Sequence, residues 1–402
     1  MQYWHAVFAF LVAAAVAGVL TPFLARLARR LGATAKPSDR GLAEAETPEL
    51  GGLAILAGVL VAAVFWMPAT IHLPHTAHTL KGSAGTVHVW AIAAGACVIT
   101  LVGAIDDAHE LSPLAKLGGQ VAAAVIAVEG GVKVTDVTLP FIGSLQFPHI
   151  GGFLTVIWLV GLMNAVNFSD GIDGLAAGLC TIDSIAFAVI AFDLHVSGAA
   201  VLAALTGGAA LGFLFYNFHP ASIFMGDSGA NLLGYLLGVV TVVGSLKTNA
   251  VVALVVPLLI LAVPFLDTGF VVAKRLKHGR TPWSADANHF HHRMVRIGFS
   301  QRKTVAYLYG WTVMLAGVAL AARFIPYSDH HGHYRLGWSV LMGAILLAAL
   351  AASVYLVYVL EILKFKRRRA RELRTFDPGT SEHEIDVRVQ RDIETGEFER
   401  VG

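Results

Sequence analysis

The sequence is poor in charged residues, and this shortage excludes most soluble proteins. Only 14% of the 402 residues are charged, while 56% are hydrophobic; in ordinary soluble domains about a quarter of the residues are charged. The mean hydropathy is +0.67. A soluble domain cannot bury that much apolar surface, so an integral membrane protein is expected.

Cysteine is also scarce. The two cysteines, Cys97 and Cys180, both lie inside apolar runs, which predicts buried, reduced thiols rather than a disulfide framework. No stretch resembles a cleavable signal peptide, and the first apolar run ends in Arg26, Arg29 and Arg30, as expected for a retained first helix. The net charge of +2 is small, and no nucleic-acid partner is expected.

Long apolar runs dominate what is present. About eleven runs are long enough to cross a bilayer, which takes roughly 17–25 residues per helix. They predict an all-α polytopic membrane protein, with a membrane domain over 1–363 and a basic, then charged and soluble, cytosolic tail over 364–402. The predicted crossings are 4–24, 51–69, 88–105, 114–130, 150–166, 175–195, 198–217, 229–246, 249–272, 304–324 and 336–361.

The basic residues predict the orientation. They gather after the first, ninth and eleventh runs, and the positive-inside rule then places these segments in the cytosol, with the N-terminus outside and the C-terminus inside. Residues 131–149 alternate apolar and polar side chains around Pro140 and Gly143. This pattern predicts a short external β-hairpin.

Four polar clusters interrupt the apolar runs, and the predicted topology brings all of them to the cytosolic face. The most polar is 164–178, which reads NAVNFSDGIDGLAAG; the others are 105–107, 224–229 and 288–293. Each alone is compatible with an ordinary turn or helix cap. Because all four clusters are predicted to lie on the same side of the membrane, we expect them to form a single site.

The acids in these clusters predict a metal. Ionised carboxylates accept hydrogen bonds and repel one another, so a group of them either shares protons or holds a cation. Mg²⁺ takes one or two carboxylates and leaves other positions to water and phosphate, which indicates a Mg²⁺–diphosphate site. The acids are Asp106, Asp107, Asp170, Asp173 and Asp227, and the cationic partners for phosphate are Lys116, His289, His291, His292 and Arg293.

Local spacing adds detail but leaves alternatives open. Asp106 and Asp107 are adjacent and point about 100° apart on a helix, so they cannot serve one atom equally. Gly171 allows the backbone to approach a ligand closely. A helix that begins near Leu175 would offer its N-terminal amides to an anion.

At these residues the chain resembles the polyprenyl-phosphate N-acetylhexosamine-1-phosphate transferase superfamily. It looks closest to the branch that initiates O-antigen, enterobacterial common antigen or teichoic acid linkage units, and the resemblance covers roughly residues 1–325. The matching motifs are Thr47-Pro48-Glu49-Leu50-Gly51-Gly52, Gly103–Asp107, Asn164–Ala176, Tyr216-Asn217, Phe224–Gly229, Pro264–Thr268 and His289–Met294. One departure is Asn231, which stands where the family more often has Leu or Met.

The resemblance implies an activity. The phosphate of undecaprenyl phosphate attacks a UDP-N-acetylhexosamine, with UDP-GlcNAc as the expected donor, and gives undecaprenyl-diphosphate-sugar and UMP. The reaction requires Mg²⁺, with Mn²⁺ as a substitute. It takes place on the cytosolic side of the inner (plasma) membrane and begins a cell-envelope polysaccharide; whether the chain forms a homodimer is left open.

The resemblance also implies roles for individual residues. Asp227 and Asn167 would hold the metal, and which of Asp106 and Asp107 acts on the polyprenyl phosphate stays open. The implied catalytic residues are Asp106, Asp107, Asp170, Asp173, His291 and His292. The implied substrate-binding residues are Lys116, Asn164, Asn167, Gly171, Asn217, Phe224, His289 and Arg293.

Two alternatives remain. The peptidoglycan branch transfers phospho-N-acetylmuramoyl-pentapeptide, but its members carry three successive histidines, which Phe290 interrupts here. A cation-coupled secondary transporter also combines many helices with intramembrane acids. Transporter sites lie near the bilayer midplane, whereas these acids fall at the ends of the apolar runs.

Overall fold

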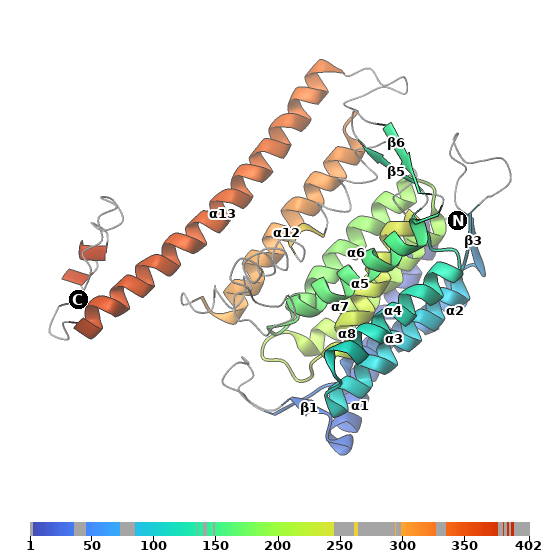
Figure 1. Cartoon of the computed structure of the whole chain (residues 1–402), viewed down its shortest axis with the longest axis horizontal. Coiled ribbons are helices and arrows are strands. Elements are labelled where there is room, and N and C mark those ends of the chain that lie inside the picture. Colours follow the sequence, from blue (N-terminus) through green and yellow to red (C-terminus); the bar gives the residue numbers. More distant parts are fainter. Residues whose placement is uncertain are drawn as a thin grey trace.

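The structure of the chain is a computed structural model, and it is almost entirely helical (Figure 1). It describes residues 3–35, 46–72, 85–134, 136–139, 143–147, 149–244, 261–263, 294, 299–326, 335–376, 381, 384–385 and 387–389. Its long helices are α1 (Tyr3–Leu31), α2 (Gly51–Trp66), α3 (Val89–His109), α4 (Pro113–Glu129), α5 (Gly151–Ser169), α6 (Leu175–Asp193), α7 (Ser197–Asn217), α8 (Gly226–Gly244), α12 (Gln301–Phe324) and α13 (Leu336–Phe376).

Every predicted crossing except 249–272 coincides with one of these helices; most of 249–272 lies outside the described residues. Within the described part, 8 helices are long and apolar enough to span a membrane. The chain is therefore a multi-pass membrane protein. The predicted total of eleven crossings and the predicted orientation stay predictions.

Two crossings are shorter than a typical membrane span. Helix α2 has 16 residues and α4 has 17, against about 20 for a typical crossing. Helix α2 ends just before Met67-Pro68, because proline cannot donate the hydrogen bond that continues a helix. Helix α4 begins at Pro113 after Ser112, whose side chain accepts a hydrogen bond from the Ala115 amide at 3.3 Å.

Helices α7 and α8 form the centre of the bundle and are the most deeply buried of the candidate spans. Helices α1, α2 and α6 pack on α7, while α3 and α5 pack on α8. Small residues allow these contacts: a side chain at Gly212 of α7 would meet the Ala14 carbonyl of α1 at 2.1 Å. Helix α12 packs on α6, and α13 lies outermost, against α12 (Figure 1).

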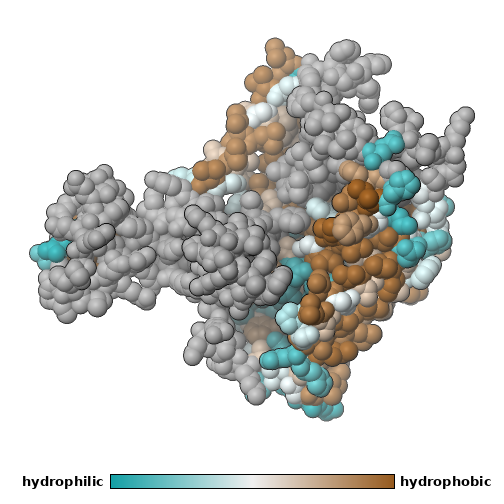
Figure 2. Space-filling view, viewed as in Figure 1, coloured by the Kyte–Doolittle hydropathy of each residue, from teal (hydrophilic) through white to brown (hydrophobic). Residues whose placement is uncertain are grey.

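On the face that Figure 2 shows, hydrophobic side chains cover much of the described surface of the bundle, and hydrophilic ones gather mainly toward its ends. Helix α13 has 41 residues and is about 60 Å long at 1.5 Å per residue, twice the thickness of the hydrocarbon core. It therefore continues beyond the membrane, and the predicted boundary at residue 363 falls inside it. The division into a membrane domain and a tail stays a prediction.

Within the described ranges, three two-stranded antiparallel sheets lie at the ends of the bundle. The hairpin expected within 131–149 is present as β5 (Asp136–Leu139) and β6 (Gly143–Gln146), although its external location is untested. The pairs β1 (Thr34–Ala35) with β2 (Thr47–Pro48), and β3 (Thr70–His72) with β4 (Thr86–His88), were not predicted from the sequence. They are too short to show an alternating pattern.

The helices alternate in direction, so α3, α5 and α7 end where α4, α6 and α8 begin. The strands β1 and β2 lie at this same end, and the β5–β6 hairpin lies at the opposite end (Figure 1). Helix α12 also begins here, because Arg302 Nη2 donates to the His219 carbonyl at 3.3 Å. Loops from distant parts of the sequence therefore meet at one end of the bundle.

Candidate active site

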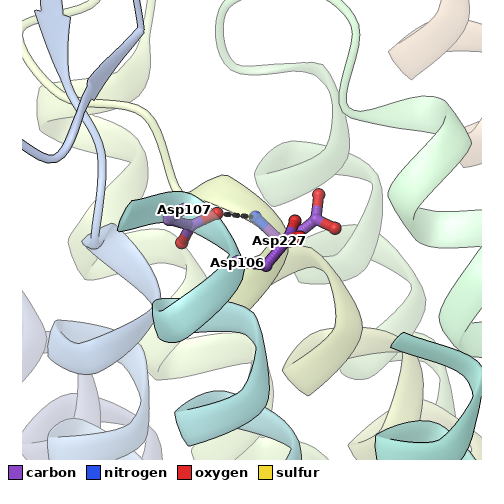
Figure 3. A group of neighbouring side chains, drawn as sticks. All are labelled: Asp106, Asp107 and Asp227. Carbon is purple, nitrogen blue, oxygen red and sulfur yellow. Dashed lines mark hydrogen bonds between the residues drawn. The ribbon is translucent and has the colours of Figure 1, made fainter. Parts of the chain in front are cut away.

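Three aspartates from two helices meet at this end. Asp106 and Asp107 lie in the last turn of α3, and Asp227 lies in the first turn of α8 (Figure 3). One carboxylate oxygen from each residue lies within 4.8 Å of the others. The structure thus brings together two of the predicted polar clusters, whose acids are more than a hundred residues apart in the sequence.

The two adjacent aspartates have different partners. Asp107 accepts hydrogen bonds from the Asp227 amide at 2.7 Å and from the Ser228 amide at 3.3 Å, so it caps the N-terminus of α8 from another helix (Figure 3). Asp106 turns to the other side, where Oδ1 accepts from the Leu111 amide at 2.7 Å. Asp107 therefore fixes α8, while Asp106 faces the Asp227 carboxylate.

Gly226 is required for this cap. Its φ is +66°, in the left-handed region, and an added Cβ would lie 2.3 Å from the Asp107 carboxylate. Any other residue here would be strained and would also displace Asp107. A glycine at this position thus lets α8 begin directly against α3.

Lys116 joins the two remaining carboxylates. Its Nζ lies 2.5 Å from Asp106 Oδ2 and 2.9 Å from Asp227 Oδ2. Asp227 also takes a hydrogen bond from the Asn167 side chain of α5. Helices α3, α4, α5 and α8 each supply one side chain to this group, which we call the acid centre: Asp106, Lys116, Asn167 and Asp227.

Glu49 and Asp170 place two further carboxyl groups beside the acid centre. Burial, followed by the neighbouring Asp107, Asp227 and Asp106, raises the pKa of Glu49 to about 7. Burial, with Asp227 and Asp107 as the next causes, raises the pKa of Asp170 to about 8. Burial is the main reason that these two carboxyls are hard to ionise, and the neighbouring carboxylates add to it.

Glu49 was not among the predicted site residues, although it lies in the motif Thr47–Gly52. This segment binds to the loop before α8: the Phe224 amide donates to the Pro48 carbonyl at 2.9 Å, and the Gly51 amide donates to the Phe224 carbonyl at 3.1 Å. These backbone bonds bring Glu49 to the acids and hold Phe224, a predicted nucleotide contact, at the edge of the site. The signal available in the sequence was the motif Thr47–Gly52 itself, which includes Glu49.

The α5–α6 loop is tied to the α7–α8 loop by the predicted residues Asp173 and Asn217. Asp173 Oδ2 accepts from His219 Nδ1 at 2.8 Å and from the Ala221 amide at 3.0 Å. Buried Asn217 accepts from the Gly174 amide and donates to the Ile223 carbonyl, both at 3.1 Å. Both residues hold loops together, and half-buried Gly171 lies in the loop that they hold; His219 was missed because nothing in its local sequence marks it.

The remaining predicted residues fall into two groups. Asn164 lies one turn before Asn167 on α5 and is hydrogen-bonded to Gln120 of α4. His289, His291, His292 and Arg293 lie outside the described residues. The next residue, Met294, is buried and belongs to the same apolar cluster as Ile172 of the α5–α6 loop and Leu175 of α6.

Comparisons with known proteins match the part of the chain that carries the acid centre. Residues 89–245 match the model of glycosyl transferase family 4. A probable undecaprenyl-phosphate N-acetylglucosaminyl 1-phosphate transferase of Bacillus subtilis is 35% identical over 79% of this chain and 86% of its own length. A decaprenyl-phosphate N-acetylglucosaminephosphotransferase of Mycobacterium leprae is 36% identical over 86% of this chain and 89% of its own.

The chain belongs to glycosyl transferase family 4. A third relative, a phospho-N-acetylmuramoyl-pentapeptide-transferase of Desulforamulus reducens, is 33% identical over 74% of this chain and 88% of its own. The predicted resemblance is thus confirmed, and the chain is an enzyme of the sugar-1-phosphate transferase type. The acid centre lies inside the matched segment, whereas Glu49 and α12 lie outside it.

The chemistry available to this family 4 enzyme follows from its charges. Lys116 carries one positive charge against Asp106 and Asp227, with Glu49 and Asp170 nearby. A phosphate approaching this group meets net negative charge unless a cation is added. Carboxylate and amide oxygens are the ligands of hard divalent cations, so Asp106, Asp227 and Asn167 fit such an ion.

Proposed function

We propose that the chain transfers N-acetylglucosamine 1-phosphate from UDP-N-acetylglucosamine to a polyprenyl phosphate, with Mg²⁺ as the cofactor. The observation that carries this proposal is the acid centre, in which carboxylates from α3 and α8 converge beside a single lysine. The sugar and the lipid are those in the names of the Bacillus and Mycobacterium relatives. Those names differ in the lipid, undecaprenyl or decaprenyl, so both acceptors enter the test below.

Asp227, Asp106 and Asn167 are the residues that would hold Mg²⁺, and the bound ion would neutralise the donor's diphosphate. Lys116 supplies a fixed positive charge between the two carboxylates, where it also meets phosphate oxygens. Asp107 holds the first turn of α8 and thereby sets the direction of the Asp227 side chain. Phe224 lies at the edge of the site, where an aromatic ring stacks on uracil.

The reaction replaces one phosphorus–oxygen bond with another. An oxygen of the polyprenyl phosphate bonds to the β-phosphorus of the UDP-sugar, and the bond from that phosphorus to the bridging oxygen breaks, so UMP leaves with that oxygen. The second pKa of a phosphate monoester is about 6, so the nucleophile is already ionised at neutral pH. The site therefore acts mainly by positioning and by charge neutralisation.

The membrane side is part of the proposal. Described basic residues at the site end are Arg26, Arg29, Arg30, Lys116, Arg302 and Lys303. Those at the opposite end are fewer, namely Lys133, Arg323 and Arg335, and Arg323 is paired with Asp193. This bias supports a site on the cytosolic face of the plasma membrane, where UDP-sugars are available, and a product that starts a cell-envelope polysaccharide.

The peptidoglycan-type reaction is the second candidate, because the Desulforamulus relative carries that name. Two observations favour N-acetylglucosamine: the relatives named for it cover more of the chain, and Phe290 interrupts the run of histidines. Membership of a transferase family speaks against the transporter alternative.

A direct assay tests the proposal. Purified protein is incubated with Mg²⁺, polyprenyl phosphate of either length, and labelled UDP-GlcNAc, UDP-GalNAc or UDP-MurNAc-pentapeptide, and lipid-extractable label is counted. We expect label from UDP-GlcNAc, release of UMP, and loss of both with EDTA. Label from UDP-MurNAc-pentapeptide alone would establish the second candidate, and label from none of the donors would refute a transferase of this kind.

The variant Asp227→Asn connects the activity to the acid centre. We expect an activity loss of about 1000-fold, comparable to removing a main electrostatic group from an active site. Asp193→Asn is the matched control, since Asp193 is ion-paired at the opposite end of the bundle. Full activity in Asp227→Asn would remove Asp227 from the mechanism.

A further inference from the structure

A row of amide side chains, of which Gln120 and Asn231 are buried and Asn164 is half-buried, lies directly beneath the acid centre. Gln120 of α4 donates from Nε2 to Asn231 Oδ1 of α8 at 2.8 Å, and its Oε1 accepts from Asn164 Nδ2 of α5 at 2.9 Å. Asn231 Nδ2 donates in turn to the Asp227 carbonyl at 2.8 Å. We call these three residues, Asn164, Gln120 and Asn231, the amide row.

The amide row and the acid centre both connect helices α4, α5 and α8. Gln120 lies one turn after Lys116 on α4, and Asn231 lies one turn after Asp227 on α8. Residues four apart share one face of a helix. Lys116 reaches Asp227, and one turn deeper Gln120 reaches Asn231, so two side-chain bonds connect α4 to α8.

The hydrogen bonds of the row all run in the same direction, from the Asn164 amide as donor toward the Asp227 carbonyl as the last acceptor. Asn231 must present its Nδ2 to the Asp227 carbonyl, so its Oδ1 faces Gln120, which then presents its Oε1 to Asn164. Asn164 Nδ2 also donates to the Val160 carbonyl at 2.8 Å. Each amide orientation is thus determined by its neighbour, and the row ends on the backbone of the residue whose carboxylate faces Lys116.

We infer that the amide row positions Asp227 and Lys116 for the cation and the diphosphate, and that Asn231 and Gln120 are positioning residues of this enzyme. Groups that orient metal-binding side chains contribute to metal affinity although they do not touch the metal. The inference rests on the proposed function and assigns Asn164 to this row rather than to the substrate. It also gives a role to Asn231, which departs from the resembled family.

Variants separate positioning from packing. Asn231→Leu leaves the Gln120 amide without its acceptor inside the bundle, so the single change lowers stability as well as activity. The double variant Gln120→Leu/Asn231→Leu removes both partners, and such paired apolar replacements can be nearly neutral in stability. The double variant therefore shows what happens to the acid centre when the bundle is stable and the row is absent.

The first measurement is the affinity for Mn²⁺. The electron paramagnetic resonance signal of the free ion reports how much Mn²⁺ is unbound, and this measurement needs no turnover. We expect the double variant to melt near the wild-type temperature but to bind Mn²⁺ about 10-fold more weakly. In the transferase assay we expect kcat to fall about 10-fold, with the KM for the lipid acceptor unchanged. The exchanged pair Gln120→Asn/Asn231→Gln keeps both amides, and we expect it to recover part of the Mn²⁺ affinity.

Thr241→Val is the matched control. It removes another hydrogen bond between α8 and α5, from Trp158 Nε1 to Thr241 Oγ1 at 2.7 Å, about 15 Å along α8 from Asn231. If a stable double variant kept the wild-type Mn²⁺ affinity and kcat, the amide row would contribute to packing only, and the inference would be wrong. Absence of transferase activity in the wild type would refute the proposed function, while the Mn²⁺ measurements would still decide the role of the row.

Discussion

Asp106 and Asp183 are both buried aspartates, with exposed fractions of 8% and 0%, but they lie in different regions of the bundle. Asp106, at the end of α3, is held by the Leu111 amide and by Lys116. Asp183 lies near the middle of α6, inside a candidate membrane span. Neither of its carboxylate oxygens has a hydrogen-bond partner among the described residues, and the neighbouring Ser184 hydroxyl has none there either.

The contrast shows that burial of an acid does not by itself mark a site. At the bundle end, backbone amides from α8 and side chains from α4 and α5 converge on the carboxylates, so their charge can be used on a cation. In the middle of α6, Asp183 has no hydrogen-bond partner among the described residues, and an unpartnered buried polar group costs about 1–3 kcal/mol. We therefore expect substitutions at the bundle end to change activity, and substitutions at Asp183 to change stability.

After the loss expected for Asp227→Asn, the largest expected effect separates the two adjacent acids at the bundle end. Asp106→Asn keeps an acceptor for the Leu111 amide but loses a charge that faces Asp227, so we expect activity to fall by about 100-fold or more with little change in stability. Asp107→Asn keeps a good cap for α8, and we expect a loss nearer 10-fold. Transferase assays and thermal melts of both purified variants measure this difference.

Asp107→Ala completes the comparison. Without the cap, we expect the free energy of unfolding to fall by about 1 kcal/mol. If Asp107→Asn lost as much activity as Asp106→Asn while melting like the wild type, Asp107 would act in the chemistry and not only on α8.

An intermediate effect concerns pH. The pKa of Glu49 is raised to about 7 and that of Asp170 to about 8, from about 4 in an unfolded chain. Between about pH 4 and these raised pKa values, the folded state binds more protons than the unfolded state. The free energy of unfolding therefore falls as pH rises. Their stabilising contribution is complete below about pH 4 and is lost as pH rises through 7 and 8.

Melting temperatures without divalent cations, taken from pH 5 to pH 8, test this sign. We expect Glu49→Gln to melt increasingly above the wild type as pH rises, because the variant avoids ionising a buried carboxyl. Glu46→Gln is the control, since Glu46 is exposed and accepts a hydrogen bond from Thr34 at 2.6 Å. A Glu49→Gln difference that stays constant with pH would contradict the raised pKa of Glu49.

The smallest effect is expected in the middle of the bundle. Asp183→Val removes two unpartnered oxygens, and we expect the melting temperature to rise by about 2 °C with unchanged activity. Asp183→Asn keeps polar atoms at the same place, and we expect a smaller rise. A loss of activity in a well-folded Asp183→Val protein would break the comparison and would assign Asp183 a function in the membrane.

Much of the fold could be predicted because the bilayer imposes a simple rule on sequence. A helix must be apolar over about 20 residues to cross it, and the runs at 4–24, 88–105 and 198–217 each became part of a helix. The alternation of crossings then placed 105–107 and 224–229 at one end, and the structure brings their acids together. Glu49 and His219 escaped prediction, because their roles depend on loops that meet only in three dimensions.

The sequence by itself therefore determined that this chain is a membrane protein of helices and which acids lie at the ends of those helices, because both depend on local patterns of hydropathy and charge. Only the tertiary structure decided that Asp107 caps α8 while its neighbour Asp106 faces Lys116. It also decided that Asn164 belongs to a row of amides. The physical reason is that hydrogen bonds between helices depend on how each helix is rotated and how close it lies to the next, and packing of the whole bundle fixes both.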